Sequence, residues 1–127
     1  VHACLRAELQ ALLDTVRAVR AVYDGPLVAS ATPIRPLPHD LPAQLVRAGA
    51  DGIGLNCCSV ADATAQLERW DLCLPLWLKL HPGPHDLPCH WLGGCCGTDP
   101  ARLRALFAAR NTDRDGQLGS AGPNTAN

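Results

Sequence analysis

The chain has 127 residues, of which 47% are hydrophobic and 18% are charged, and a formal net charge of −1. This balance is typical of a folded globular chain and argues against disorder throughout. Because the net charge is small and the arginines are scattered, the composition favours neither nucleic acid nor an anionic membrane as a partner.

No apolar run approaches the roughly 18 residues of a membrane span, and the sequence shows no secretion-signal pattern. We therefore expect a cytoplasmic protein. The seven cysteines include two adjacent pairs. An odd count with adjacent pairs favours reduced thiols over a disulfide framework.

The first predicted element is an amphipathic helix over residues 3–22, where leucine and valine recur at helical spacing. Asp24-Gly25-Pro26 ends it, and residues 27–31 predict a short buried strand of a parallel sheet. The proline-rich stretch 32–42 predicts a loop at the carboxyl end of that strand, where barrel enzymes place their chemistry.

The alternation of helix and strand continues along the chain. The later predicted elements are a helix at 43–48, strands at 52–56, 73–80 and 89–92, a helix at 60–70 between the first two of these strands, and a helix from 100 to about 109. Pro75 predicts that pairing of its strand begins only after it. Asp99 or Thr98 is the expected N-cap of the last helix, with Pro100 in its first turn.

One connection is too short for its place in this pattern. Only residues 81–88 lie between the last two predicted strands, whereas a parallel crossover that contains a helix needs about a dozen residues or more. Eight extended residues span at most about 26 to 29 Å. We therefore expect a bare return to the next strand, with one crossover helix missing.

Residues 1–110 form the predicted folded domain, and residues 111–127, rich in Gly, Asn, Ser and Thr, predict a disordered tail. Four tail residues match positions 1, 3, 5 and 6 of a calcium loop: Asn111, Asp113, Asp115 and Gly116. Position 12 is Gly122 instead of a bidentate glutamate. The tail is therefore interpreted as solvated chain and not as a calcium site.

Two motifs stand at the ends of predicted strands, Gly54-Leu55-Asn56-Cys57 and Gly93-Gly94-Cys95-Cys96-Gly97-Thr98-Asp99-Pro100. Adjacent cysteines are too close to bridge one another comfortably, and the glycines leave room around them. Three thiols on two strand ends look like a zinc site, and a fourth, open position marks catalytic zinc. Taken singly, each cysteine would instead be interpreted as a small buried apolar residue.

Together the motifs resemble the homocysteine S-methyltransferase family. The resemblance implies a partial (β/α)₈ TIM barrel, about its C-terminal half, in which Cys57 ends strand six and Cys95 and Cys96 end strand eight. These three cysteines would bind Zn²⁺. The residues expected to support them are Asn56, Gly93, Gly94, Gly97 and Thr98.

The implied reaction transfers a methyl group from a donor to the thiol of homocysteine and forms methionine. The donor stays open between a trimethylammonium, a sulfonium and an enzyme-bound methyl carrier.

A complete barrel needs roughly 250 residues, so about half of it is expected to be missing. The sequence has no methionine, and we expect a piece of a longer protein that is inactive alone. An open half barrel exposes two edge strands and its interior, which favours a homo-oligomer or association with the missing half. The alternative is a non-catalytic remnant that serves as a metal-binding or oligomerising module.

A rival metal set consists of His81, His85, Cys89 and His90. Prolines flank it, so no regular helix can hold the spacing, and these histidines are expected to be loop residues. The cysteines assigned to packing are Cys4, Cys58, Cys73 and Cys89. Lys79, the only lysine, is expected to extend from a strand end toward water.

Overall fold

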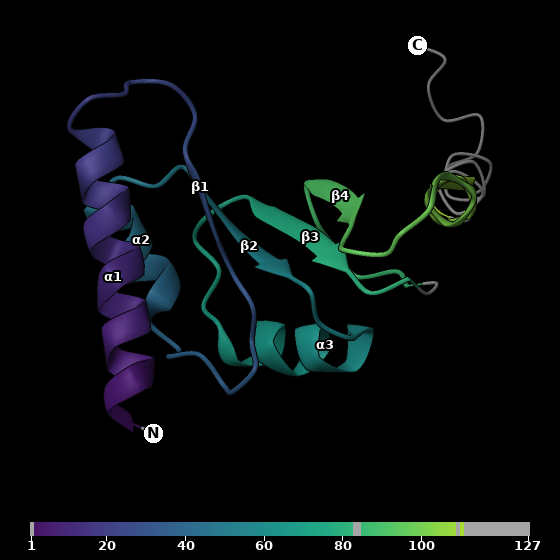
Figure 1. The fold of residues 1–127 in the computed structure, drawn as a ribbon, viewed down its shortest axis with the longest axis horizontal. Coiled ribbons are helices and arrows are strands. Elements are labelled where there is room, and N and C mark those ends of the chain that lie inside the picture. The colour runs from purple at the N-terminus through teal and green to yellow at the C-terminus, as the bar shows by residue number, and fades with distance from the viewer. Residues whose placement is uncertain (1, 83–84, 109, 111–127) are drawn as a thin grey trace, which may run out of the picture.

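The computed structural model describes residues 2–82, 85–108 and 110. Its elements in chain order are α1 (His2–Arg20), β1 (Val28–Ala31), α2 (Leu41–Ala48), β2 (Gly52–Asn56), α3 (Val60–Arg69), β3 (Leu76–Leu80), β4 (Trp91–Gly94) and a last helix at 100–108 (Figure 1). Helices and strands alternate as the sequence predicts, and the fold class is α/β. The predicted tail at 111–127 lies outside the described residues, as does the side chain of Cys4.

The strands form one parallel sheet in the order β1-β2-β3-β4. Right-handed crossovers between strands that follow one another in this order place successive helices on the same face. The burial pattern agrees, because Leu55 and Leu78 point to the covered face and are fully buried, whereas Trp77 and Lys79 point to the other. Helices on one face of a four-stranded parallel sheet are consistent with a partial barrel half.

The hydrophobic core lies between this covered face and the helices. Its fully buried leucines and isoleucine are Leu41 and Leu45 of α2, Ile53 and Leu55 of β2, and Leu78 of β3. From α1, Leu13 and Val16 reach the same cluster. In Figure 1, α1 lies beside α2 at one end of the sheet.

Two predicted helix boundaries differ from the structure by two residues. The first helix ends at Arg20 instead of residue 22, because the Arg20 side chain turns to bind the loop that follows it. The second begins at Leu41 and so includes Pro42 in its first turn, a position where the missing N–H of proline costs no helical hydrogen bond.

The last strand was predicted two residues too early. It begins at Trp91 and includes Gly93 and Gly94, which pair with Lys79 and Leu80 of β3. Glycines are typical of turns, but these two extend the ladder. Pairing of β3 begins after Pro75, as predicted.

Residues 81–82 and 85–90, the described part of the connection between β3 and β4, contain no helix. This is the short return that the sequence predicts. His90 fixes the start of β4 against β3. Its backbone N–H donates to the carbonyl of Leu76 at 2.9 Å, and its ring Nδ1 accepts from the backbone N–H of Leu76 at 3.0 Å.

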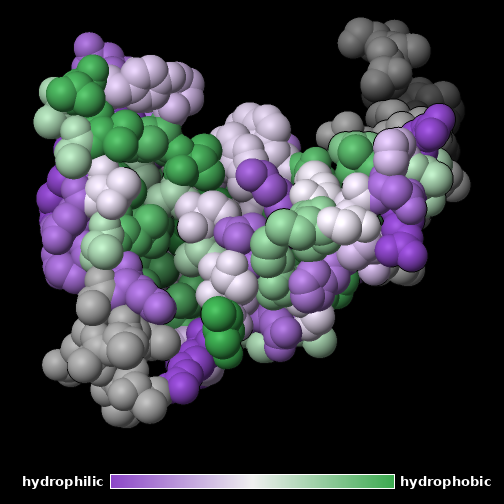
Figure 2. Space-filling view, in the orientation of Figure 1, coloured by the Kyte–Doolittle hydropathy of each residue, from purple (hydrophilic) through white to green (hydrophobic). Residues whose placement is uncertain are grey.

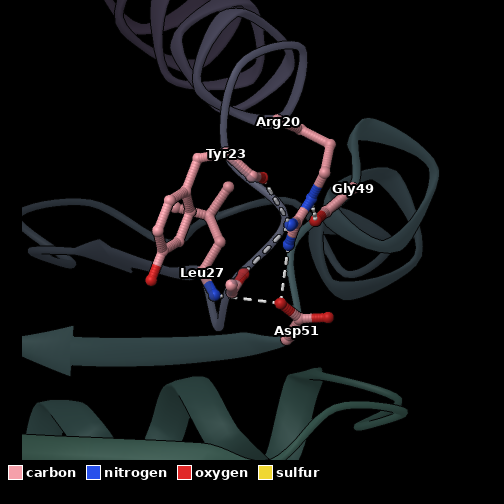
Figure 3. A network of polar contacts seen from close by, with 6 residues as sticks. Arg20, Tyr23, Leu27, Gly49 and Asp51 are labelled. Atoms are coloured by element: carbon pink, nitrogen blue, oxygen red, sulfur yellow. Dashed lines mark hydrogen bonds and ion pairs between the residues drawn. The ribbon is translucent and has the colours of Figure 1, made fainter.

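Arg20 ties the elements together at the amino-terminal edge of the sheet (Figure 3). Its guanidinium donates to the carbonyls of Gly49, Tyr23 and Gly25 at 2.8, 2.8 and 3.0 Å and to the carboxylate of Asp51 at 2.6 Å. The same carboxylate oxygen accepts from the N–H of Leu27 at 2.9 Å. The hydrogen bond from Leu27, assisted by Arg20, holds the pKa of Asp51 below its ordinary value.

Candidate metal centre

Cys57 lies in the turn that follows β2, at the carboxyl-terminal edge of the sheet. Its φ of 54° is positive, which is uncommon for a residue other than glycine. Its N–H donates to the carbonyl of Lys79 at 3.0 Å, and the N–H of His81 donates to the carbonyl of Cys58 at 2.9 Å. These bonds bend the chain over the end of β3.

Asn56 connects this turn to the neighbouring strand. Its Oδ1 accepts from the hydroxyl of Ser30, and its Nδ2 donates to Oγ1 of Thr32 at 2.9 Å. The Asn56 side chain is also the largest influence that lowers the pKa of the Cys57 thiol. Asn56 therefore fixes its own position against β1 and favours the thiolate form of its neighbour.

Cys95 and Cys96 follow β4 directly. The turn closes when the N–H of Thr98 donates to the carbonyl of Cys95 at 3.1 Å, with Gly97 at a φ of 79° that favours glycine. A Cβ at Gly94 would lie 2.5 Å from Cγ2 of Thr98, so glycine is required there by contact.

Gly93 differs from the other glycines of the motif, because a Cβ there would meet only Cγ of Lys79 at an ordinary 3.6 Å. The hydroxyl of Thr98 is buried and has no hydrogen-bond partner among the residues that the structure describes. It lies in the turn that carries two of the three thiols.

The structure brings the three candidate thiols together. After Asn56, the N–H of Cys96 and the thiols of Cys96 and Cys95 lower the pKa of Cys57. Burial, followed by the neighbouring Cys57, raises the pKa of Cys95. Cys58 belongs to the core instead, where burial raises its pKa to about 11.

Within residues 2–82, 85–108 and 110, no group of three or more His, Cys, Asp or Glu side chains has an arrangement that could hold a metal ion. The three thiols thus influence one another's pKa without forming a group that could hold a metal as they stand. As a donor set, three thiolates fit Zn²⁺ well.

The rival set is not assembled. His90 accepts from the backbone of Leu76, and Cys89 accepts from Nη1 of Arg110 at 3.2 Å. Both ring nitrogens of His85 are buried without a hydrogen-bond partner in the described part of the chain. His81, His85 and His90 lie in loops, as predicted. Cys73 is exposed and makes no contribution to the core cluster, so its predicted packing role is wrong.

Ser30 and Thr32 are neighbours of the candidate site that sequence reasoning missed. They hold Asn56 from the adjacent strand end. The available signal was a pair of hydroxyl residues at the carboxyl end of one strand beside an asparagine at the end of the next. Lys79 is exposed on the uncovered face, as expected.

No known family model, curated protein or solved structure matches this chain. Across the described residues, no helix combines the length and apolarity that a membrane crossing requires.

Proposed function

We propose that this chain carries the zinc-binding half of a homocysteine S-methyltransferase, with Cys57, Cys95 and Cys96 as the metal ligands. The observation that carries the proposal is that Cys95 and Cys96, which come from the second motif, lie near enough to the Cys57 thiol to lower its pKa. The two motifs that resemble the family thus end at one place.

The site lies at the carboxyl ends of parallel strands, where barrel enzymes bind their substrates. Cys57, Cys95 and Cys96 would hold Zn²⁺ as thiolates, and a fourth ligand position would be open to the sulfur of homocysteine. When bound, zinc stabilises the thiolate form of a substrate thiol, whose ordinary pKa of about 8.5 would leave it mostly protonated at neutral pH.

The residues of the chain hold and shape this centre. Asn56 fixes the Cys57 turn against β1, and Gly94 and Gly97 allow the tight turn that presents Cys95 and Cys96. In the reaction, homocysteine sulfur loses its proton to solvent and forms a bond to the methyl carbon of the donor. The bond between that carbon and its leaving group breaks, and the electron pair departs with the leaving group.

Binding of the methyl donor and orientation of homocysteine would need further groups from the other half of the barrel. Positioning of two reactants in near-attack geometry contributes roughly 7 to 11 kcal/mol at its best. We therefore expect zinc binding without appreciable methionine formation by this chain alone. A complementing barrel half should restore turnover, measured as methionine formed from each of the three donor classes.

The test of the metal site is titration with Zn²⁺ and with Co²⁺, whose thiolate charge-transfer absorption reports the ligands. About one equivalent should bind. Cys57→Ser and Cys96→Ser should each weaken binding far more than Cys73→Ser, the matched control at an exposed cysteine remote from the motifs. Equal losses in Cys73→Ser and Cys57→Ser would contradict the ligand assignment.

The alternative of a non-catalytic module is favoured by one observation, the uncovered sheet face that carries Trp77 and Trp91. It predicts zinc binding or self-association with no turnover even when a complementing half is added. The same methionine measurement therefore separates the two functions.

A further inference from the structure

Lys79 lies on the uncovered face of β3, between the two strands that lead to the candidate metal ligands. In the register of the sheet it pairs with Asn56 of β2 and with Gly93 of β4. Cys57 follows Asn56 directly, and Cys95 comes two positions after Gly93. Because neighbouring strands lie about 4.8 Å apart, the Lys79 side chain starts about one strand spacing from each of the strands that carry the thiols.

None of the described residues pairs with the ammonium group of Lys79. Within residues 2–82, 85–108 and 110, this group forms no ion pair and donates no hydrogen bond. On one side, Asn56 is neutral and is held by Ser30 and Thr32. On the other side, Gly93 has no side chain. The lysine is therefore a cation without a counter-charge at the carboxyl ends of parallel strands, where barrel enzymes bind their substrates.

Gly93 leaves room for Lys79 on this face. A Cβ at Gly93 would lie 3.6 Å from Cγ of Lys79, so the lysine stem extends beside the glycine, toward β4. Gly93 has neither the positive φ of Gly97 nor the close contact of Gly94, so neither the backbone nor the packing demands glycine there. The missing side chain keeps the space beside the lysine stem open, on the strand that leads to the second motif.

The surface around this position is chemically mixed. Figure 2 shows polar and apolar side chains together in the region of β3 and β4, in contrast to the apolar surface beside α1. Such a surface suits a small substrate that has both charged and aliphatic parts. Homocysteine is a molecule of this kind, because a short aliphatic chain joins its thiol to its carboxylate. With the sulfur held at the cysteines, the carboxylate stays within a short distance of them.

We propose that Lys79 binds the carboxylate of the thiol substrate, an inference that rests on the proposed function. Its ammonium group donates charge-assisted hydrogen bonds to the carboxylate oxygens. Lysine suits this role because its flexible four-carbon stem carries a compact charge to the anion. The carboxylate belongs to the acceptor and not to the methyl donor, because the sulfur fixes the position of the acceptor. Lys79 thereby selects thiols that carry an acid.

The test measures thiol binding to the full chain loaded with Co²⁺, whose thiolate charge-transfer absorption rises when another thiolate binds. The probes are homocysteine, 4-mercaptobutanoate, which lacks the amine, and 3-aminopropanethiol, which lacks the carboxylate. The native chain should bind both acids more tightly than 3-aminopropanethiol. Lys79→Met should weaken binding of both acids by about three- to five-fold, the range expected for one exposed ion pair, and should not weaken binding of 3-aminopropanethiol.

Two further variants control for charge and for folding. Lys79→Arg should keep the preference for acids, because it retains the charge. Arg69→Met removes an exposed cation in the last turn of α3 and should leave all three affinities unchanged.

The possible failures separate this inference from the proposed function. If Lys79→Met weakened binding of the three thiols equally, or of none of them, the role of Lys79 would be wrong while the ligand assignment stood. A chain that bound Co²⁺ but no thiol would also overturn that role. Failure to take up Co²⁺ would instead contradict the proposed metal site, and the role of Lys79 with it.

Discussion

The amino-terminal and carboxyl-terminal edges of the sheet, where the strands begin and end, differ in how their polar groups are paired. At the amino-terminal edge, Arg20 and Asp51 join α1 to the starts of β1 and β2, and the polar groups of that network are matched to one another. At the carboxyl-terminal edge, Cys57 has a positive φ, the hydroxyl of Thr98 has no partner among the described residues, and three thiols gather. The first edge stabilises the fold, and the second carries the groups that we propose as metal ligands.

The largest effect on the carboxyl-terminal edge, a loss of zinc affinity, is expected from Asn56→Ala. The variant removes the bonds to Ser30 and Thr32 and the support of Cys57, and loss of such supporting contacts typically costs 10- to 100-fold in metal affinity. Zinc affinity should fall by about this factor while the fold persists. Competition with a chromophoric chelator measures the affinity. Unchanged zinc binding would contradict the role of Asn56.

Gly94→Ala tests the turn that presents Cys95 and Cys96. The added Cβ would lie 2.5 Å from Thr98, and we expect a loss of about 1 to 3 kcal/mol in the free energy of unfolding, accompanied by weaker zinc binding. Gly93→Ala is the control, because its Cβ has only an ordinary contact. Urea denaturation of both variants compares them, and equal losses would refute the steric argument.

Arg20→Ala removes the hydrogen-bond network at the amino-terminal edge of the sheet. Removal of the guanidinium leaves the part-buried carbonyls of Gly49 and Gly25 without their donor, at an expected cost of about 1 to 2 kcal/mol in stability. Zinc affinity should stay unchanged, because the network lies at the far end of the strands. A variant that loses zinc and keeps its denaturation midpoint would reverse the roles assigned to the two edges.

The smallest effect is the acid dependence of the same network. Because the folded pKa of Asp51 is lowered from 3.8, its contribution is present above that value and is lost as the pH falls through the lower folded pKa. The stability difference between the native chain and Asp51→Asn should therefore shrink below about pH 4. Denaturation midpoints between pH 6 and pH 2 measure it, and a constant difference would exclude Asp51 as the cause.

Elements that depend on short stretches of chain were predictable. Apolar spacing places the helices, Pro75 marks where β3 begins to pair, and the short connection after β3 leaves little room for a helix. Asp99 caps the last helix as expected, since its Oδ1 accepts from the N–H of Arg102 at 2.8 Å. The start of β4 was not predictable, because the pairing of Gly93 and Gly94 with β3 is a contact between distant residues.

The candidate site was likewise predictable only in part. The sequence places three cysteines at two strand ends, but β3 lies between those strands, which are therefore roughly 10 Å apart. Their meeting depends on the turn at Cys57, whose N–H bonds the end of β3 and whose φ is positive.

By itself, the sequence determined the α/β alternation, the lack of a helix in the described part of the connection between β3 and β4, and the strand ends that carry the thiols, because periodicity and turn chemistry act over a few neighbouring residues. Only the tertiary structure decided which side chains meet: Asn56 with Ser30 and Thr32, Arg20 with Asp51, and Trp77 with Trp91. These contacts join residues on different elements, and their geometry is set by sheet register and by the bends at strand ends.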